Sequence, residues 1–190
     1  GNRFSRAWDE LGERLLANTR PRAILAVSAH WYTCGTYVSD AARNRHVNDM
    51  YGFPPELYAV DYAPDGDPSL ARRVVELLNA SSGFVRTGKA RTNADWGIDH
   101  GIWSVLCHLV PHADVPVVMM SCDGTRDAAS LLETGRALAP LREDGVLILA
   151  SGNVVHNLRA LDPTRPDAGA PDAVAFDRWV TDAVRRHDTE

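Results

Sequence analysis

One apolar run, Ala23-Ile24-Leu25-Ala26-Val27-Ser28-Ala29, sets the architecture expected of this chain. It lacks polar alternation, and strands that are buried on both faces of a parallel sheet have this pattern. Residues 115–121 and 145–150 form two similar runs. Pro116 stands at the entrance of the first of these, where a strand tolerates proline. The three runs therefore predict three inner strands of one sheet.

Helical patterns separate these strands. Apolar residues recur at helical spacing over residues 5–18 and 128–138, and again after Pro171. Asp67 and Pro68 suit the N-cap and the first position of a further helix. Strands that alternate with helices predict an α/β fold with a central, mostly parallel sheet flanked by helices. We expect residues 1–190 to form a single catalytic-type domain.

Composition excludes several classes of protein. The chain has 190 residues, with 20 Lys+Arg against 25 Asp+Glu and a net charge of −5, so a basic nucleic-acid surface is not expected. Its longest apolar runs are far shorter than the roughly 20 residues of a membrane-spanning helix. Three scattered cysteines suggest neither a disulfide framework nor a zinc ribbon. We expect a cytoplasmic protein with no nucleic-acid or membrane partner.

Three histidines lie where ligands bind in α/β proteins, beyond the carboxyl ends of strands and in nearby turns. His30 follows the first strand, His156 follows the last, and His100 lies in a turn between glycines. Any one of them is more often a hydrogen-bonded structural residue, but three at such positions favour a shared site. Neutral imidazole suits iron, zinc, copper or nickel, and a histidine outside the metal shell can act as a general base.

The other histidines suggest no site. His108 and His112 have the spacing of a helical metal pair, but Pro111 breaks the helix that would align them. His46 and His187 lie among polar residues, so we expect both to be solvated. The chain also lacks a nucleophile elbow, a phosphate loop, a His-Glu-x-x-His motif and a dinucleotide glycine fingerprint. Cys34 stands too far along the strand from His30 to pair with it as a nucleophile.

Four segments carry a family resemblance: Val27-Ser-Ala-His-Trp31, Asp49-Met-Tyr-Gly-Phe-Pro-Pro-Glu-Leu-Tyr58, Trp96-Gly-Ile-Asp-His-Gly101 and Ala150-Ser-Gly-Asn-Val-Val-His-Asn157. In this order they resemble the class III extradiol ring-cleavage dioxygenases of the DOPA dioxygenase type. The resemblance extends over residues 2–161 and more weakly to the helix that holds Phe176 and Trp179.

The resemblance implies a non-haem Fe(II) enzyme that binds a catechol through both hydroxyls and splits the ring beside them with dioxygen. Zinc is an alternative occupant of such a site. By motif, His30 resembles a metal ligand, and His156 resembles an acid/base or a further ligand. His100 resembles the histidine that contacts substrate or bound oxygen.

Aromatic side chains near these motifs are candidates for the wall of a substrate pocket. Trp31, Tyr51 and Phe53 are the predicted substrate-binding residues, with Trp103 as a further candidate. Core packing is the alternative for each of them. Tyr51 and Phe53 are favoured because Gly and Pro place them on a loop.

The sequence departs from the family pattern at both ends. The family's strand ending in His-Gly-Ser-Pro would precede Gly1, and a late metal histidine would follow Glu190, so we expect part of the metal shell to be missing. Asn48 stands where relatives often carry His or Tyr. Two alternatives therefore stay open: a non-catalytic binding protein of the same fold, and a zinc hydrolase with Asp99 or Asp123 as base.

Overall fold

The structure is a computed structural model that describes residues 3–160, 162, 164–165 and 168–187. The chain forms two compact units, residues 1–151 and 152–190. The prediction that the whole chain is one catalytic domain stays a prediction. No helix in the described parts of the chain is both long enough and apolar enough to cross a membrane.

The first unit is built on a five-stranded sheet of order β3-β2-β4-β1-β5. Its strands are β1 (Ala23–Thr33), β2 (Tyr37–Val38), β3 (Arg91–Thr92), β4 (Val117–Asp123) and β5 (Val146–Ala150). β1 runs parallel to both β4 and β5, and β2 is parallel to β3 but antiparallel to β4. The mostly parallel α/β fold is confirmed, and two of the three predicted inner strands, β1 and β4, lie inside the sheet. The third, β5, is a strand as predicted, but it lies at the edge of the sheet, and its central residues are only half-buried.

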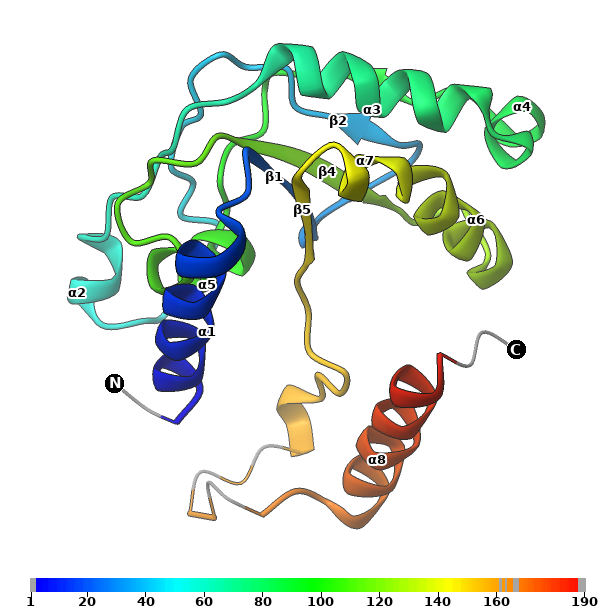
Figure 1. Cartoon of the computed structure of the whole chain (residues 1–190). Coiled ribbons are helices and arrows are strands. Elements are labelled where there is room, and N and C mark those ends of the chain that lie inside the picture. Colours follow the sequence, from blue (N-terminus) through cyan, green and yellow to red (C-terminus); the bar gives the residue numbers. More distant parts are fainter. Residues whose placement is uncertain (1–2, 161, 163, 166–167, 188–190) are drawn as a thin grey trace. The chain divides into compact units, whose positions relative to one another are not determined.

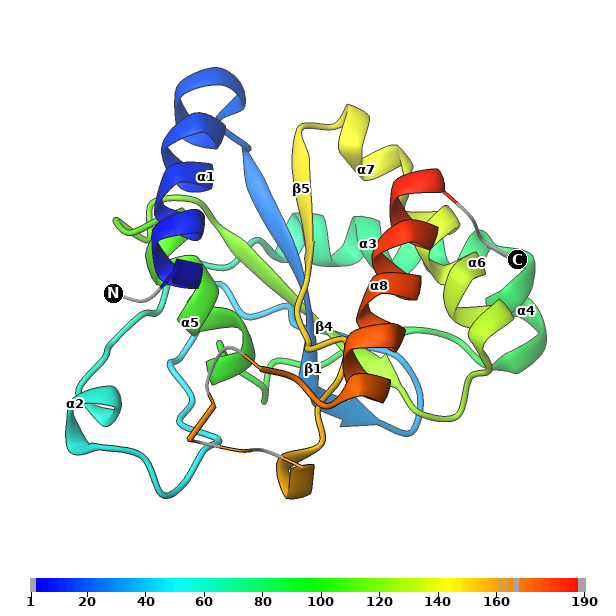
Figure 2. The ribbon, with the colours of Figure 1, turned by 90° about the horizontal axis from the view of Figure 1, so that it is seen from below.

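Helices cover both faces of this sheet, as Figures 1 and 2 show. On one side, α1 and α5 lie against each other, and α5 packs on β1. The other helices of this unit are the short α2 and the group α3, α4, α6 and α7, of which α3 and α7 contact the sheet. Their bounds are α1 Arg3–Thr19, α2 Pro55–Tyr58, α3 Pro68–Ala80, α4 Ser82–Thr87, α5 His100–Leu109, α6 Ala128–Leu138 and α7 Pro140–Glu143.

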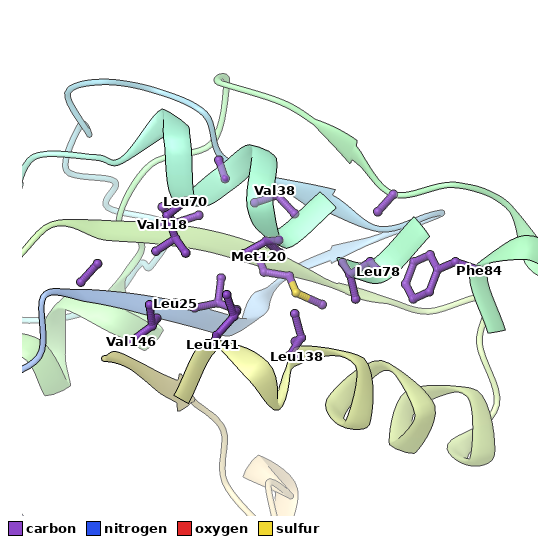
Figure 3. Close-up of a cluster of buried hydrophobic side chains, with 14 residues drawn as sticks. Leu25, Val38, Leu70, Leu78, Phe84, Val118, Met120, Leu138, Leu141 and Val146 are labelled. Atoms are coloured by element: carbon purple, nitrogen blue, oxygen red, sulfur yellow. The ribbon is translucent and has the colours of Figure 1, made fainter. Parts of the chain in front are cut away.

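The core is divided in two by the sheet, because successive side chains of a strand point to opposite faces. Leu25 and Val118 belong to the cluster beneath α3, α6 and α7, which Figure 3 shows. Ile24 and Met119, their neighbours along the strands, belong to the cluster beneath α5. All four are completely buried, and each such side chain contributes about 1.5–3 kcal/mol to folding. The absence of alternation in the sequence follows from this burial on both faces.

Helix boundaries follow the local signals. Asp67 caps α3 by accepting hydrogen bonds from the backbone nitrogens of Ser69 and Leu70, and Pro68 is the first helical residue, as predicted. α5 ends at Leu109, before Pro111, so no helix aligns His108 with His112.

The second unit contains η1 (Leu158–Ala160) and α8 (Pro171–Arg186). The predicted helix after Pro171 is confirmed. The rings of Phe176 and Trp179 stack on α8 with centroids 5.8 Å apart, and both side chains are exposed.

Candidate functional site

His30 owes its position to an irregularity in β1. β1 and β4 pair in register as far as Ser28 and Ser121, and pairing resumes only at Tyr32 and Cys122. Residues 29–31 therefore have no partner on β4. Extra residues of this kind bend a strand and redirect its side chains. The imidazole of His30 is exposed at the carboxyl edge of the sheet, while the Trp31 side chain is only 5% exposed.

His100 is the first residue of α5. Asp99 is the N-cap of this helix, but its side chain makes no capping hydrogen bond. A carboxylate from another segment takes that role: the backbone nitrogen of His100 donates to Oδ1 of Asp49 at 2.9 Å. A negative charge at this position also interacts favourably with the helix dipole.

Asp49 joins the two imidazoles. Nδ1 of His30 lies 2.8 Å from Oδ2 of Asp49, and Nδ1 of His100 lies 2.8 Å from Oδ1. The two rings are nearly perpendicular, at 84°, with centroids 4.0 Å apart. Burial raises the pKa of the Asp49 carboxyl, but hydrogen bonds from His100 and His30 outweigh it, so the pKa lies below its ordinary value of 3.8. Asp49 is therefore an ionised acceptor at neutral pH.

The donor chemistry of this cluster fits a metal ion. One ligand atom from each of His30, Asp49 and His100 can be chosen so that all lie within 4.8 Å of one another. A neutral imidazole that donates through Nδ1 keeps an unprotonated Nε2. Metal-binding histidines in proteins usually donate their other ring N–H to a carboxylate or carbonyl in this way. The hydrogen bonds to Asp49 therefore leave Nε2 of each imidazole available to bind a metal ion.

A second carboxylate, Asp99, is completely buried beside this cluster. Nε1 of Trp96 donates to its Oδ2 at 2.9 Å, but Oδ1 has no hydrogen-bond partner in the described part of the chain. Burial raises the pKa of this carboxyl above its ordinary value of 3.8. A Cβ added at Gly101 would meet Asp99 Oδ1 at 3.3 Å and His30 Cδ2 at 2.9 Å, so glycine is needed where these groups converge.

The predicted substrate-binding residues differ in exposure. Trp31 stacks on Trp96 within the core, with ring centroids 6.0 Å apart. Tyr51 and Phe53 follow Asp49 on the same loop and are 92% and 49% exposed. Trp103 is buried and donates through Nε1 to the backbone oxygen of Val47.

The remaining candidates are not members of the cluster of His30, Asp49 and His100. His156 is exposed and belongs to the unit formed by residues 152–190, so its role stays a prediction. Asp123 pairs with Arg126 and is not a member of the cluster. The expectation that His46 is solvated is wrong: the residue is half-buried and hydrogen-bonds through both ring nitrogens, to Asn48 and to the backbone of Tyr62.

Sequence reasoning missed the role of Asp49. The only signal for it was its place at the start of a segment that resembles the family, beside Asn48. No spacing or periodicity connects Asp49 with His30 or His100, because 19 and 51 residues separate them along the chain.

The amino-acid sequence also matches a known protein family. Residues 3–190 match the family described as the catalytic LigB subunit of aromatic ring-opening dioxygenase. The chain belongs to this family. The resemblance carried by the four sequence segments is thereby confirmed.

Individual members of the family are similar over most of the chain. It is 42% identical over 179 residues to a 4,5-DOPA dioxygenase extradiol of Escherichia coli (strain K12), covering 94% of this chain and 63% of that protein. A protein of the same name from Beta vulgaris is 39% identical over 184 residues, covering 96% and 65%. The crystal structure of an uncharacterized E. coli K12 protein matches with a TM-score of 0.76 and 38% identity, covering 95% and 65%. The chain thus spans less than two thirds of these relatives.

Proposed function

We propose that this protein cleaves the aromatic ring of a DOPA-like catechol with dioxygen, beside the two hydroxyls, at a non-haem Fe(II). One observation supports the proposal above all: in a member of a ring-opening dioxygenase family, a single carboxylate holds two imidazoles 4.0 Å apart at the carboxyl edge of the sheet. Relatives named extradiol DOPA dioxygenases support the choice of substrate class.

We assign the metal to Nε2 of His30, with Asp49 keeping the proton on Nδ1. Fe(II) held there would bring the catechol and dioxygen together and would let electron density pass between them. Zinc suits the same donors but has no redox chemistry. In this assignment His30 is a ligand, and Asp49 orients it from outside the metal shell.

His100 and His156 act on the reactants. Asp49 fixes His100 through both its backbone nitrogen and its ring, which leaves Nε2 of His100 to contact substrate or oxygen. His156 takes the second catechol proton and later returns it, the general acid/base role that imidazole commonly has in catalysis. Tyr51 and Phe53 form an apolar wall against the ring, and Trp31 supports the site from the core.

Oxygen uptake tests the proposal. The full chain is mixed anaerobically with Fe(II) and DOPA or another catechol, and oxygen is then admitted. We expect oxygen consumption together with a yellow ring-fission product. Both should be lost in His30→Gln and His100→Gln and kept in His112→Gln, which replaces an exposed histidine outside the cluster.

Metal binding separates the proposal from its alternatives. His30→Gln should also weaken binding of Fe(II) or Zn²⁺ in the absence of any substrate. Binding of a catechol without oxygen uptake would favour a non-catalytic binding protein. Ester or amide hydrolysis with Zn²⁺, and no reaction with oxygen, would favour a hydrolase.

A further inference from the structure

A cavity of about 190 Å³ lies at the carboxyl ends of β1 and β4, beside the turn that leads into β2. Residues 34–37, 88, 89, 91 and 123 line it, and none of these belongs to the cluster of His30, Asp49 and His100. Pockets for drug-sized molecules have volumes of about 300–1,000 Å³. This cavity therefore suits a small ion or a single functional group of a larger molecule.

Asp123 is the one acidic side chain among the residues that line the cavity, and its oxygens are saturated. They accept hydrogen bonds from the Gly35 nitrogen at 3.0 Å, the Thr36 hydroxyl at 3.2 Å, and the nitrogen and hydroxyl of Thr125 at 3.0 and 2.6 Å. Nε of Arg126 adds a fifth, at 3.1 Å. A carboxylate offers about four lone-pair sites, so Asp123 has no capacity left for a ligand.

Arg126 cancels the charge of Asp123. Its side chain is only 3% exposed, and its Cζ lies 3.6 Å from the centroid of the Phe84 ring. Nη2 donates to the backbone oxygen of Gly88, which lines the cavity. Nη1 is buried and has no hydrogen-bond partner among the residues that the structure describes. Arg126 is not among the residues that line the cavity, so it neutralises Asp123 without offering a donor to a ligand there.

The other polar side chains of the cavity are donors. Lys89 and Arg91 are exposed, and neither forms an ion pair with any residue in the described ranges. Tyr37 and Cys34 also line the cavity. Since Asp123 and Arg126 cancel, two positive charges remain unbalanced, and the cavity offers donors without a free acidic acceptor.

We propose that this cavity is a binding site for a small oxyanion, a phosphate or carboxylate group, held by Lys89 and Arg91. The planar fork of Arg91 suits two oxygens of such a group, and the ammonium of Lys89 adds a point charge. This site is independent of the proposed ring cleavage, because its residues differ from those assigned to the metal and the catechol.

Calorimetric titration of the full chain tests the proposal. Inorganic phosphate and succinate are titrated separately, at an ionic strength held constant with chloride, and the arm that binds identifies the group. We expect Lys89→Gln/Arg91→Gln to weaken binding by about tenfold or more, because charge-assisted hydrogen bonds are lost. Arg14→Gln/Arg142→Gln removes the same charge from exposed positions outside the cavity and should bind like the wild type. Melting curves show that each variant folds.

Alkylation of Cys34 gives a second readout, because this exposed thiol lines the cavity. The ratio of its reaction rates with iodoacetate and iodoacetamide should fall several-fold in Lys89→Gln/Arg91→Gln, and the bound anion should slow the wild type. The Cys34→Ser variant shows how much of the alkylation takes place at Cys107 and Cys122, so that the reaction of Cys34 can be measured by difference. Failure of both anions to bind, an unchanged rate ratio, or equal loss of binding in the Arg14 and Arg142 control would overturn the proposal.

Discussion

Replacing Asp49 with asparagine removes a charge while keeping the shape of the side chain. The remaining Oδ1 can still accept from the backbone nitrogen and Nδ1 of His100. The new amide NH₂ group, however, faces Nδ1 of His30, which lies 2.8 Å from Oδ2 in the wild type. Two donors cannot pair, so Nδ1 of His30 must become an acceptor, and its ring proton must move to Nε2.

The size of the effect follows from the three hydrogen bonds of Asp49. Bonds to a charged group contribute about 1.5–3 kcal/mol each against about 0.5–1.5 for neutral ones, a difference of about 1–1.5 kcal/mol per bond, so the three bonds predict that Asp49→Asn lowers the free energy of unfolding by about 3–4.5 kcal/mol. Loss of an orienting carboxylate costs about 10–100-fold in metal affinity. The variant should therefore stay folded and bind Fe(II) or Zn²⁺ poorly.

Urea unfolding, metal titration and ¹⁵N spectra of the imidazoles measure these changes. Asp9→Asn is the matched control, because Oδ1 of Asp9 lies 2.8 Å from Nδ1 of His108 in a pair outside the cluster. We expect that change to cost about 0–1 kcal/mol, as for exposed ion pairs, and to leave metal binding intact. An Asp49→Asn variant that binds metal like the wild type, with the ring proton of His30 still on Nδ1, would refute the role assigned to Asp49.

Three further changes test the electrostatics and the packing. Asp99→Asn should raise the free energy of unfolding near pH 7, because burial raises the pKa of Asp99 above 3.8 and its ionisation at higher pH disfavours the folded state. This gain should disappear below pH 3.8. Urea unfolding that shows no difference between the variant and the wild type at any pH would contradict this. Gly66→Ala should prevent stable folding, because the added Cβ would overlap the carbonyl oxygen of Ala41. Gly135→Ala on α6 is the matched control, because its added Cβ meets no described atom within 4 Å. This second change should raise the thermal midpoint and add about 0.5–1 kcal/mol to the free energy of unfolding. Ile102→Ala should cost about 2–5 kcal/mol in urea unfolding, because the side chain is completely buried, and a loss below 1 kcal/mol would show loose packing beneath α5.

The inner strands β1 and β4 could be predicted because burial on both faces leaves a continuous apolar pattern. β5 has the same pattern in the sequence but lies at the edge of the sheet, a position that the sequence does not reveal. β2 and β3 escaped prediction, since each has only two residues and both Arg91 and Thr92 are exposed. The extension of β1 to Thr33 was also missed, because the run that predicts this strand stops at Ala29. Residues beyond it pair only after the irregularity, and that depends on β4 rather than on local sequence.

The site was predictable in part from the positions of its histidines along the chain. The ends of strands and neighbouring turns are places where side chains from distant segments meet, which brought His30 and His100 into consideration together. Asp49 and Asp99 act through contacts that no sequence period encodes: Asp49 lies on a loop, and Asp99 lacks the capping hydrogen bond that an N-cap usually makes. Burial, which distinguishes Asp99 from an ordinary surface carboxylate, becomes visible only in three dimensions.

Residues 29–31 of β1 have no partner on β4, so the position of His30 depends on the number of residues in this segment. Ala29 and His30 are both exposed while Trp31 is buried, so loss of Trp31 would move His30 into the buried position directly before Tyr32. The imidazole would then enter the apolar interior and leave the carboxyl edge of the sheet. The loss of a single codon would thus remove the proposed metal ligand while the order of strands and helices stayed the same. When genes of this family are compared, the length of this segment is therefore as informative as the identity of its residues.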